Sequence, residues 1–189
     1  GNWWMRIISG YFKGKKILTP KDIKTRPLKD MTKESMFNVI KHSNKFNIQI
    51  KNSTVLDLFS GVGSFGIECL SNEAKYVTFV ENYQGVLPIL EQNLENLKLE
   101  GRFEIINQNI FSDLSLKRNN YDIIFLDPPY KQGNIDKLID EIFHKKLLKN
   151  KGLIILHRNK KSKENYSKYL KVLDEKNYGI SKIMFGTLN

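Results

Sequence analysis

The sequence contains a single cysteine, Cys69, among its 189 residues. One cysteine cannot form an intramolecular disulfide or a multi-cysteine metal site, so we expect a reducing, cytoplasmic compartment. No apolar run approaches the roughly 18 residues that a transmembrane helix needs, and the run Ile123–Leu126 is only strand-sized. Nothing near the N-terminus has the long apolar core of a secretory signal. These absences predict a protein without a membrane segment or a disulfide framework.

Histidine is also scarce. His42, His144 and His157 are scattered, and no pair has the spacing of metal ligands. We therefore expect no metal and interpret all three histidines as structural. The composition, 40% hydrophobic and 27% charged, excludes disorder as the dominant state. The length predicts one domain with a small appendage.

Positive charge is abundant and unevenly distributed. Residues 1–51 contain 12 basic and 3 acidic side chains, residues 52–130 contain 5 and 11, and residues 131–189 contain 14 and 6. An acidic centre between two basic ends indicates a polyanionic partner, with nucleic acid as the first choice. The alternative is a general enrichment in solvated lysine, because 26 of the 31 basic residues are lysine.

The basic N-terminal segment, residues 5–51, is predicted to form a hairpin and a helix. Short β-prone pieces, Arg6–Ser9 and Lys15–Leu18, flank a glycine-containing turn, and Asp30 can cap a helix that extends to about His42. Residues 1–4 precede a methionine, and we expect at least part of them to be an expression remnant.

Basic side chains of this segment stand among aromatic residues, which suits phosphate contact combined with base stacking. A solvated hairpin face is the alternative interpretation. The candidate RNA-binding residues are Lys13, Lys15, Lys16 and Arg26.

Residues 52–189 alternate between strand and helix patterns. Strands are predicted at Thr54–Leu58, Tyr76–Glu81, Phe103–Ile106, Tyr121–Leu126 and Leu153–His157, and helices at Gly63–Ser71, Tyr83–Leu99 and Ile135–Leu148. A polar, helical stretch at Lys160–Tyr169 and a terminal hairpin, Leu170–Lys176 with Ile180–Phe185, are expected to follow. This alternation predicts a doubly wound α/β domain with a parallel sheet and helices on both faces.

A glycine-rich turn, Asp57–Gly66, follows the first of these strands and opens a helix. Gly61, Gly63 and Gly66 have the spacing of a nucleotide-binding turn, where glycine permits tight turning and close approach to a ligand. Glu81 ends the next strand, where its carboxylate can accept hydrogen bonds from two ribose hydroxyls. A tight strand–helix turn without a ligand is the alternative.

The charge of Asp57 decides between cofactor classes. A carboxylate at the strand end repels a pyrophosphate but attracts a ligand amino group that carries positive charge. The sequence therefore favours S-adenosylmethionine over a dinucleotide.

The second motif, Asp127-Pro128-Pro129-Tyr130, comes directly after the apolar strand Tyr121–Leu126. Two prolines remove two amide donors and fix the backbone, which leaves the Asp127 carboxylate and backbone carbonyls as acceptors. Such acceptors beside the aromatic Tyr130 suit a planar NH₂ group on a ring, with the nitrogen lone pair aimed at an incoming methyl group. The alternative is a turn that ends a strand, with Tyr130 as packing.

Together the two motifs resemble class I S-adenosylmethionine-dependent methyltransferases that act on exocyclic amines. The N-terminal pieces Met5–Gly10, Phe12–Lys16, Thr25–Pro27 and Glu34–Asn38 narrow the resemblance to the bacterial RsmD family. Those enzymes methylate N2 of one guanine in 16S ribosomal RNA. The resemblance covers essentially the whole chain from Met5 and implies a seven-stranded sheet whose last hairpin contributes an antiparallel strand.

The resemblance also implies roles for single residues. Asp57, Phe59, Gly61 and Gly63 would line the methionine end of the cofactor, and Glu81 would hold its ribose. Asn82, Asn109 and Ile110 would lie beside the adenine, although the family usually has an aspartate where Asn109 stands. Asp127, Pro128, Pro129 and Tyr130 would hold the target base. His157 stands near the position of a family glutamate, and we assign it no catalytic role.

The resulting expectation is a monomeric enzyme that methylates guanine N2 in 16S rRNA within a small-subunit assembly intermediate. Three alternatives remain. A DNA amino-methyltransferase shares both motifs but usually needs a larger recognition domain. A protein-glutamine methyltransferase usually has asparagine at the first motif position and needs no basic segment. A non-catalytic RNA-binding protein has no need of the intact Asp127–Tyr130 motif.

Overall fold

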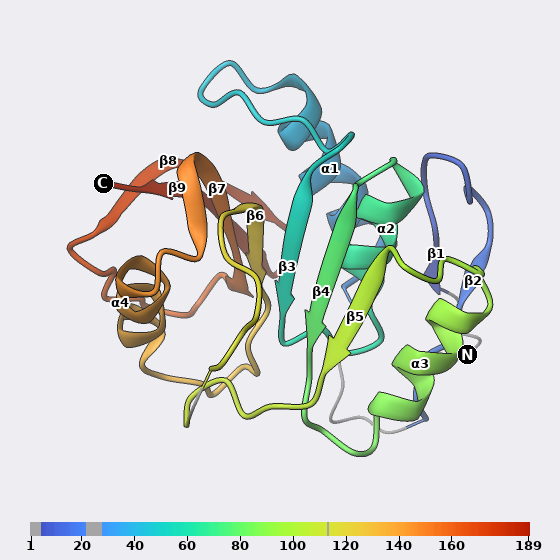
Figure 1. Cartoon of the computed structure of the whole chain (residues 1–189). Coiled ribbons are helices and arrows are strands. Elements are labelled where there is room, and N and C mark those ends of the chain that lie inside the picture. The colour runs from blue at the N-terminus through green and yellow to red at the C-terminus, as the bar shows by residue number, and fades with distance from the viewer. Residues whose placement is uncertain (1–4, 22–27, 113) are drawn as a thin grey trace.

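The computed structural model describes residues 5–21, 28–112 and 114–189. Its centre is a seven-stranded sheet with the order β5-β4-β3-β6-β7-β9-β8 (Figure 1). The strands are β3 Thr54–Leu58, β4 Tyr76–Val80, β5 Phe103–Ile106, β6 Tyr121–Leu126, β7 Leu148–Asn159, β8 Leu170–Tyr178 and β9 Ser181–Leu188. Five neighbouring strands pair in parallel, and β9 runs antiparallel to both β7 and β8.

The strand order places a topological switch between β3 and β6. From β3 the chain winds outward through β4 to β5, then returns to β6 and winds the other way to β7. The connection from β3 to β4 and the connection from β6 to β7 therefore run in opposite directions across the sheet. A crevice opens between them, at the carboxyl ends of β3 and β6. Both glycine-rich and Asp-Pro-Pro-Tyr segments begin at this edge, directly after β3 and β6.

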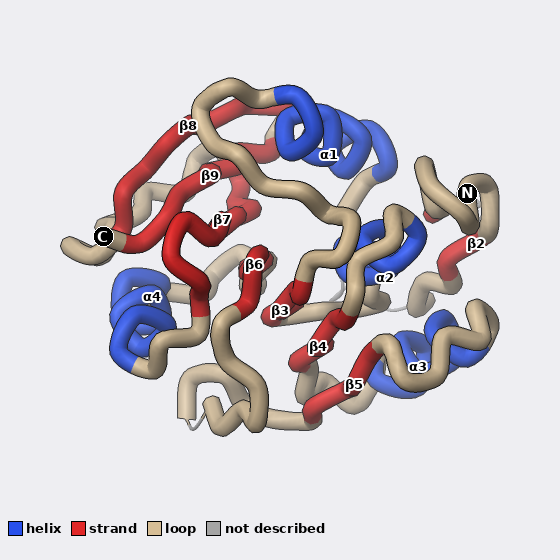
Figure 2. The backbone as a smooth tube through the Cα atoms, turned by 45° about the horizontal axis from the view of Figure 1, so that its top comes forward, coloured by secondary structure: helices blue, strands red, loops and turns tan. Residues whose placement is uncertain are grey.

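Helices cover both faces of the sheet, as Figure 2 shows edge-on. They are α1 Asp30–His42, α2 Ser64–Ser71, α3 Leu87–Glu95 and α4 Ile135–His144. The first three helices share one buried cluster with alternate residues of the strands, among them Val55, Phe79 and Phe125. The intervening residues Leu56 and Leu126 point to the other face, where they pack with α4. The strands are buried on both sides, so their apolar runs are continuous rather than alternating.

The N-terminal hairpin packs against α2 instead of extending into solvent. Its strands, β1 Met5–Arg6 and β2 Lys16–Ile17, pair antiparallel, and four of its apolar side chains, Met5, Ile7, Phe12 and Ile17, belong to the main core cluster. The amide of Tyr11 donates to the carbonyl of Ser71 at the C-terminal end of α2. The hairpin is therefore part of the hydrophobic core.

A buried ion pair fastens this hairpin to α1 and α2. Lys33 Nζ lies 3.1 Å from Glu68 Oε1, and both side chains are fully buried. Glu68 also accepts hydrogen bonds from the amides of Ile8 and Ser9, and Lys33 donates to the carbonyl of Arg6 and the hydroxyl of Ser64. Every charge-bearing atom of the pair has partners, which is the condition under which a buried ion pair is tolerated.

The predicted fold class is confirmed, but several local predictions need correction, among them the strand predicted at Leu153–His157, which begins at Leu148. The first helix has Lys29 at its N-cap without a side-chain cap, and Asp30 instead accepts from the amide of Arg6. The predicted helix at Ile135–Leu148 ends at His144, because Lys146 adopts a left-handed φ of 54° and the chain enters β7 at Leu148.

The helix predicted at Tyr83–Leu99 is α3, which begins only at Leu87, because the amides of residues 82 and 83 bond to the Glu81 carboxylate. The predicted helix at residues 160–169 does not form. That stretch is almost entirely polar, so a helix there would have no apolar face to bury. Within the three described ranges, no helix is long and apolar enough to cross a membrane.

Candidate active site

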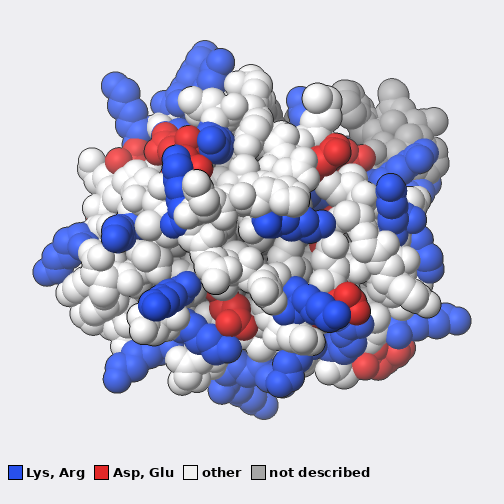
Figure 3. Space-filling view, turned by 90° about the horizontal axis from the view of Figure 1, so that it is seen from above, with Lys and Arg blue, Asp and Glu red and all other residues white. Residues whose placement is uncertain are grey.

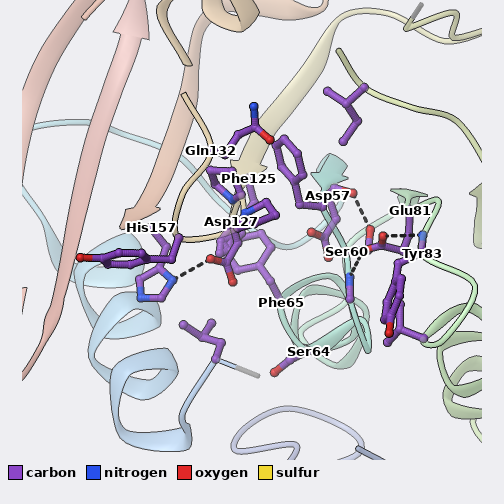
Figure 4. Close-up of a pocket in the computed structure, with 18 of the residues that line it drawn as sticks. Asp57, Ser60, Ser64, Phe65, Glu81, Tyr83, Phe125, Asp127, Gln132 and His157 are labelled. Carbon is purple, nitrogen blue, oxygen red and sulfur yellow. Dashed lines mark hydrogen bonds and ion pairs between the residues drawn. The ribbon is translucent and has the colours of Figure 1, made fainter. Parts of the chain in front are cut away.

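A pocket with a volume of about 620 Å³ lies at the carboxyl ends of the central strands. The loops after β3, β4, β5 and β6 contribute to it, together with the end of β7 and the turn between β8 and β9. Figure 4 shows Glu81 and Tyr83 on one side of this pocket and Asp127 and His157 on the other, with Asp57 between them. The predicted residues that line it are Asp57, Phe59, Gly61, Glu81, Asn82, Asn109, Ile110, Asp127, Pro128, Pro129 and Tyr130.

The glycine-rich turn contains three alternate residues with positive φ. Phe59, Gly61 and Gly63 have φ values of 60°, 56° and 90°. Positive φ is ordinary for glycine but costly for a bulky residue such as Phe59, so the turn holds this side chain in a strained conformation beside the pocket. Gly63 itself does not line the pocket; a Cβ there would lie 2.6 Å from the Leu90 side chain, so it packs the turn against α3.

Gly66 permits close packing of α2 on the sheet. A Cβ at Gly66 would lie 2.4 Å from the ring of Phe79 in β4. Its amide donates a 3.0 Å hydrogen bond to Oδ2 of Asp57. The third glycine of the motif thus brings the first turn of α2 against the strand and fixes the Asp57 carboxylate.

Asp57 is almost completely buried, with 2% of its surface exposed. Burial raises the pKa of its carboxyl well above the usual value, the Gly66 hydrogen bond opposes this, and the charges of Asp127 and Glu81 add to the rise. A positive charge bound next to Asp57 would offset the cost of ionising it. The electrostatics of the pocket therefore favour a cationic ligand group.

Glu81 is held by three backbone amides. Oε1 accepts from Gly61 at 2.8 Å, and Oε2 accepts from Asn82 and Tyr83, each at 3.0 Å. These bonds join the ends of β3 and β4 and fix the carboxylate at the pocket wall. Three of the roughly four acceptor sites of this carboxylate are used, which leaves one on Oε1 for a ribose hydroxyl.

Aromatic and apolar groups form the wall next to Glu81. Ile110 is buried, and the rings of Phe59 and Phe111 lie 5.6 Å apart between their centroids. The side-chain oxygen of Asn109 accepts a 3.0 Å hydrogen bond from the Phe111 amide, so this residue stabilises its own turn while it lines the pocket. Phe111 is absent from the sequence predictions, and the available signal was an aromatic residue directly after the predicted Asn109 and Ile110.

The Asp-Pro-Pro-Tyr segment forms the opposite wall. The carbonyl of Pro129 accepts from the Gln132 amide at 2.9 Å and from Arg158 at 3.1 Å, which uses both of its lone pairs. Arg158 also donates to the carbonyl of Gln132 at 2.8 Å. Its own charge is paired with Glu164 at 2.6 Å. The carbonyl of Pro129 is therefore occupied, whereas the Asp127 carboxylate and the Pro128 backbone remain among the groups that line the pocket.

His157 is the second residue that the sequence analysis missed. Its Nδ1 lies 2.8 Å from Oδ1 of Asp127, and its Nε2 lies 2.8 Å from the hydroxyl of Ser181 in β9 (Figure 4). Burial disfavours the charged ring, but the charge and hydrogen bond of Asp127 outweigh burial and raise the pKa of His157. The prediction that His157 is purely structural is therefore incomplete, because the ring contacts a motif residue inside the pocket.

The candidate RNA-binding residues of the hairpin lie away from this pocket. Lys13 and Lys15 belong to the turn that bonds to Ser71, at the end of α2 opposite the pocket, and Lys16 lies in β2. Arg26 lies outside the described residues. Among the residues that the structure describes, no group of three or more His, Cys, Asp or Glu side chains could hold a metal ion.

A doubly wound sheet with a glycine-rich turn after β3 and an Asp-Pro-Pro-Tyr segment after β6 defines a class I methyltransferase. The family described as Conserved hypothetical protein 95 matches residues 5–187. The chain belongs to this family, the RsmD family that the sequence resembles.

Curated relatives and solved structures agree with this assignment. The ribosomal RNA small subunit methyltransferase D of Buchnera aphidicola is 37% identical over 82% of this chain and 78% of its own length. The protein of the same name from Escherichia coli is 32% identical over 82% of this chain and 74% of its length. The solved structure of yhhF from Escherichia coli has a TM-score of 0.82 and 27% identity, with 98% of both chains covered.

Proposed function

We propose that this protein transfers a methyl group from S-adenosylmethionine to the exocyclic N2 amine of a guanine in 16S ribosomal RNA. The observation that carries the proposal is a single pocket in which three features meet. The buried carboxylate of Asp57 suits a cationic group, and the fixed carboxylate of Glu81 suits a ribose hydroxyl. The motif that begins at Asp127 lies on the opposite wall. The names of the curated relatives support small-subunit rRNA as the substrate class. We place the reaction in the cytoplasm, on a small-subunit assembly intermediate, with the enzyme as a monomer.

The residues present fit the cofactor. Glu81 has the position and the fixed orientation to bind the ribose hydroxyls, and Phe59, Ile110 and Phe111 offer apolar surface for the adenine. Asp57 provides negative charge for the methionine end of the ligand. S-adenosylmethionine would supply an electrophilic methyl group from its sulfonium sulfur, and with the loss of that carbon–sulfur bond it would leave as the neutral thioether S-adenosylhomocysteine.

On the substrate side, Asp127 would accept a hydrogen bond from the guanine N2–H and take up its proton as the new N–C bond forms. Tyr130, which is 58% exposed, would stack on the base. A guanine must leave its stack to reach this pocket. Because Arg158 and Gln132 already bind the carbonyl of Pro129, the acceptor wall is rigid before substrate arrives, and we attribute most of the rate enhancement to positioning.

Transfer of a labelled methyl group tests the proposed function directly. The purified protein would be incubated with labelled S-adenosylmethionine and naked 16S rRNA, assembled small subunits, DNA or a glutamine-containing protein. We expect label in RNA only, recovered as N2-methylguanosine, with small-subunit particles as better substrates than naked RNA. Methylated adenine or cytosine in DNA, or methylated glutamine, would replace the proposal with that activity.

His157→Gln is expected to lower kcat about tenfold or more without changing cofactor affinity. The glutamine amide can reach Ser181 but no longer donates to Asp127, and a hydrogen bond to a charged group is worth about 1.5–3 kcal/mol. Rates at saturating RNA and calorimetry with the cofactor provide the measurements.

His157→Asn is the matched control, because its amide lies near the place of Nδ1 and can still donate to Asp127. It should retain most of the activity but lose the contribution of the histidine charge to the pH profile. In the wild type that charge is present below the raised pKa of His157 and is lost as the pH rises through it. Equal rates in the two variants would show that the Asp127 contact does not matter.

A further inference from the structure

We propose that a groove lined by Tyr130, Lys131, Asn159, Lys160, Lys161 and Ile180 binds the sugar–phosphate backbone of the RNA strand that flanks the target guanine. This inference rests on the proposed function and names a substrate contact for that same site. These six residues are here called the flank groove. Tyr130 and Lys131 belong to the loop after β6, Asn159 ends β7, Lys160 and Lys161 follow it, and Ile180 lies in the turn between β8 and β9.

The flank groove is continuous with the active-site pocket. Its volume is about 430 Å³, and three of its lining residues, Tyr130, Asn159 and Ile180, also line the pocket. A base stacked on Tyr130 inside the pocket would therefore place its ribose and phosphates at the entrance to the groove. The neighbouring nucleotides are covalently tied to that base, so a strand must leave the pocket along a surface of this kind.

Charge in the groove suits phosphate. Lys131, Lys160 and Lys161 are exposed, and within the described part of the chain none of them forms an ion pair with a carboxylate. Glu164, the acidic residue of the loop that follows β7, is paired with Arg158, and both side chains are less than a tenth exposed. The three lysines are therefore exposed and, among the described residues, without a carboxylate in ion-pair contact.

The groove is also preformed and partly apolar. The amide of Lys160 donates to the carbonyl of Ile180 at 2.8 Å, and the amide of Lys161 donates to Oδ1 of Asn159 at 2.9 Å. Tyr130 and Ile180 are 58% and 55% exposed. An ordered surface that combines unpaired lysines with an exposed aromatic ring is the arrangement used to bind single-stranded nucleic acid.

Position, rather than charge alone, distinguishes this groove from other basic surfaces. Figure 3 views the molecule from the edge where β3 and β4 begin, opposite the pocket, and Lys and Arg side chains surround that face as well. The hairpin lysines Lys13 and Lys15 lie near the far end of α2. The flank groove shares residues with the pocket, so it can contact the nucleotides next to the target.

The experiment compares three triple-alanine variants: the groove set Lys131, Lys160 and Lys161; the hairpin set Lys13, Lys15 and Lys16; and a matched control set Lys75, Lys117 and Lys171. All nine lysines are exposed, and each variant removes three positive charges. Affinity for naked 16S rRNA and for small subunits would be measured at several salt concentrations, beside cofactor affinity and the melting temperature.

The groove variant should bind RNA more weakly, with a log–log salt slope lowered by about 2 to 3, because each lost phosphate contact removes about 0.7 to 0.9. Its KM for RNA should rise while kcat at saturating RNA and cofactor affinity stay unchanged. A groove variant with three arginines should retain wild-type binding. The control set should change neither slope nor KM.

An unchanged salt slope in the groove variant, or the same loss in the control variant, would overturn the inference. A change confined to the hairpin variant would assign RNA binding to the hairpin and refute the groove. Failure of the proposed function looks different: the wild type would then transfer no methyl group to RNA, whatever the slopes of the variants.

Discussion

Asp127→Ala should lower the single-turnover rate of methyl transfer by at least about 100-fold, the range expected when a positioned proton acceptor is lost. The Asp127 carboxylate lines the pocket, and the carbonyl of Pro129 in the same segment is already hydrogen-bonded to Gln132 and Arg158. Cofactor affinity should fall little, since Glu81 and the glycine-rich turn are held by bonds that do not involve Asp127. Labelled-methyl transfer at saturating RNA and calorimetry would measure the two quantities separately.

Glu81→Ala provides the reverse pattern and serves as the control. It removes the carboxylate proposed to hold the ribose, so cofactor affinity should fall more than tenfold, while the rate at saturating cofactor should fall less than in Asp127→Ala. If Asp127→Ala kept a near-normal single-turnover rate, the role of Asp127 as the acceptor for the substrate amine would be wrong. If Glu81→Ala bound the cofactor normally, the role of Glu81 in holding the ribose would be wrong.

Glu68→Ala is expected to lower the free energy of unfolding by about 3–5 kcal/mol, the typical cost of leaving one charge of a buried pair without its partner. Lys33 would remain fully buried next to the vacated space, and the amides of Ile8 and Ser9 would lose their acceptor. Denaturant unfolding followed by circular dichroism would measure the loss.

Two variants separate the ion pair from other effects of this change. Glu141→Ala breaks the half-exposed pair with Lys145 on α4 and should cost much less, because solvent screens such pairs. The double change Lys33→Met with Glu68→Gln leaves no buried charge and keeps one acceptor for the hairpin, so it should be more stable than Glu68→Ala. A cost for Glu68→Ala no larger than that for Glu141→Ala would contradict the prediction.

Much of the sheet could be predicted because its strands are locally distinctive. Buried parallel strands appear as continuous apolar runs, and Thr54–Leu58 and Tyr121–Leu126 have the predicted bounds. The errors fall where several short-range signals compete. The predicted helix Ile135–Leu148 extends too far and the predicted strand Leu153–His157 begins too late, because a left-handed residue, Lys146, ends the helix and β7 begins at Leu148, where it pairs with β6.

The candidate site shows the same division between local and non-local information. Asp57, Glu81 and Asp127 could be predicted because each lies at, or directly after, the carboxyl end of its own strand. The contact of His157 with Asp127 depends on the register of β7 against β6, in which Leu156 lies opposite Leu126. The next residues on both strands therefore meet. Arg158 was missed for a similar reason, because its carbonyl partners lie 26 to 29 residues earlier in the chain.

The burial of Asp57 makes the proton a competitor of the cofactor. In the free protein the pKa of Asp57 is raised well above its usual value, so the carboxyl keeps its proton over a wider pH range than an exposed aspartate. In the proposed function, a cationic ligand group at Asp57 favours the ionised form, so binding expels that proton. Observed cofactor affinity therefore weakens as the pH falls below the pKa of the free protein. Under the proposed function, acidification would therefore lower the occupancy of the pocket by the cofactor.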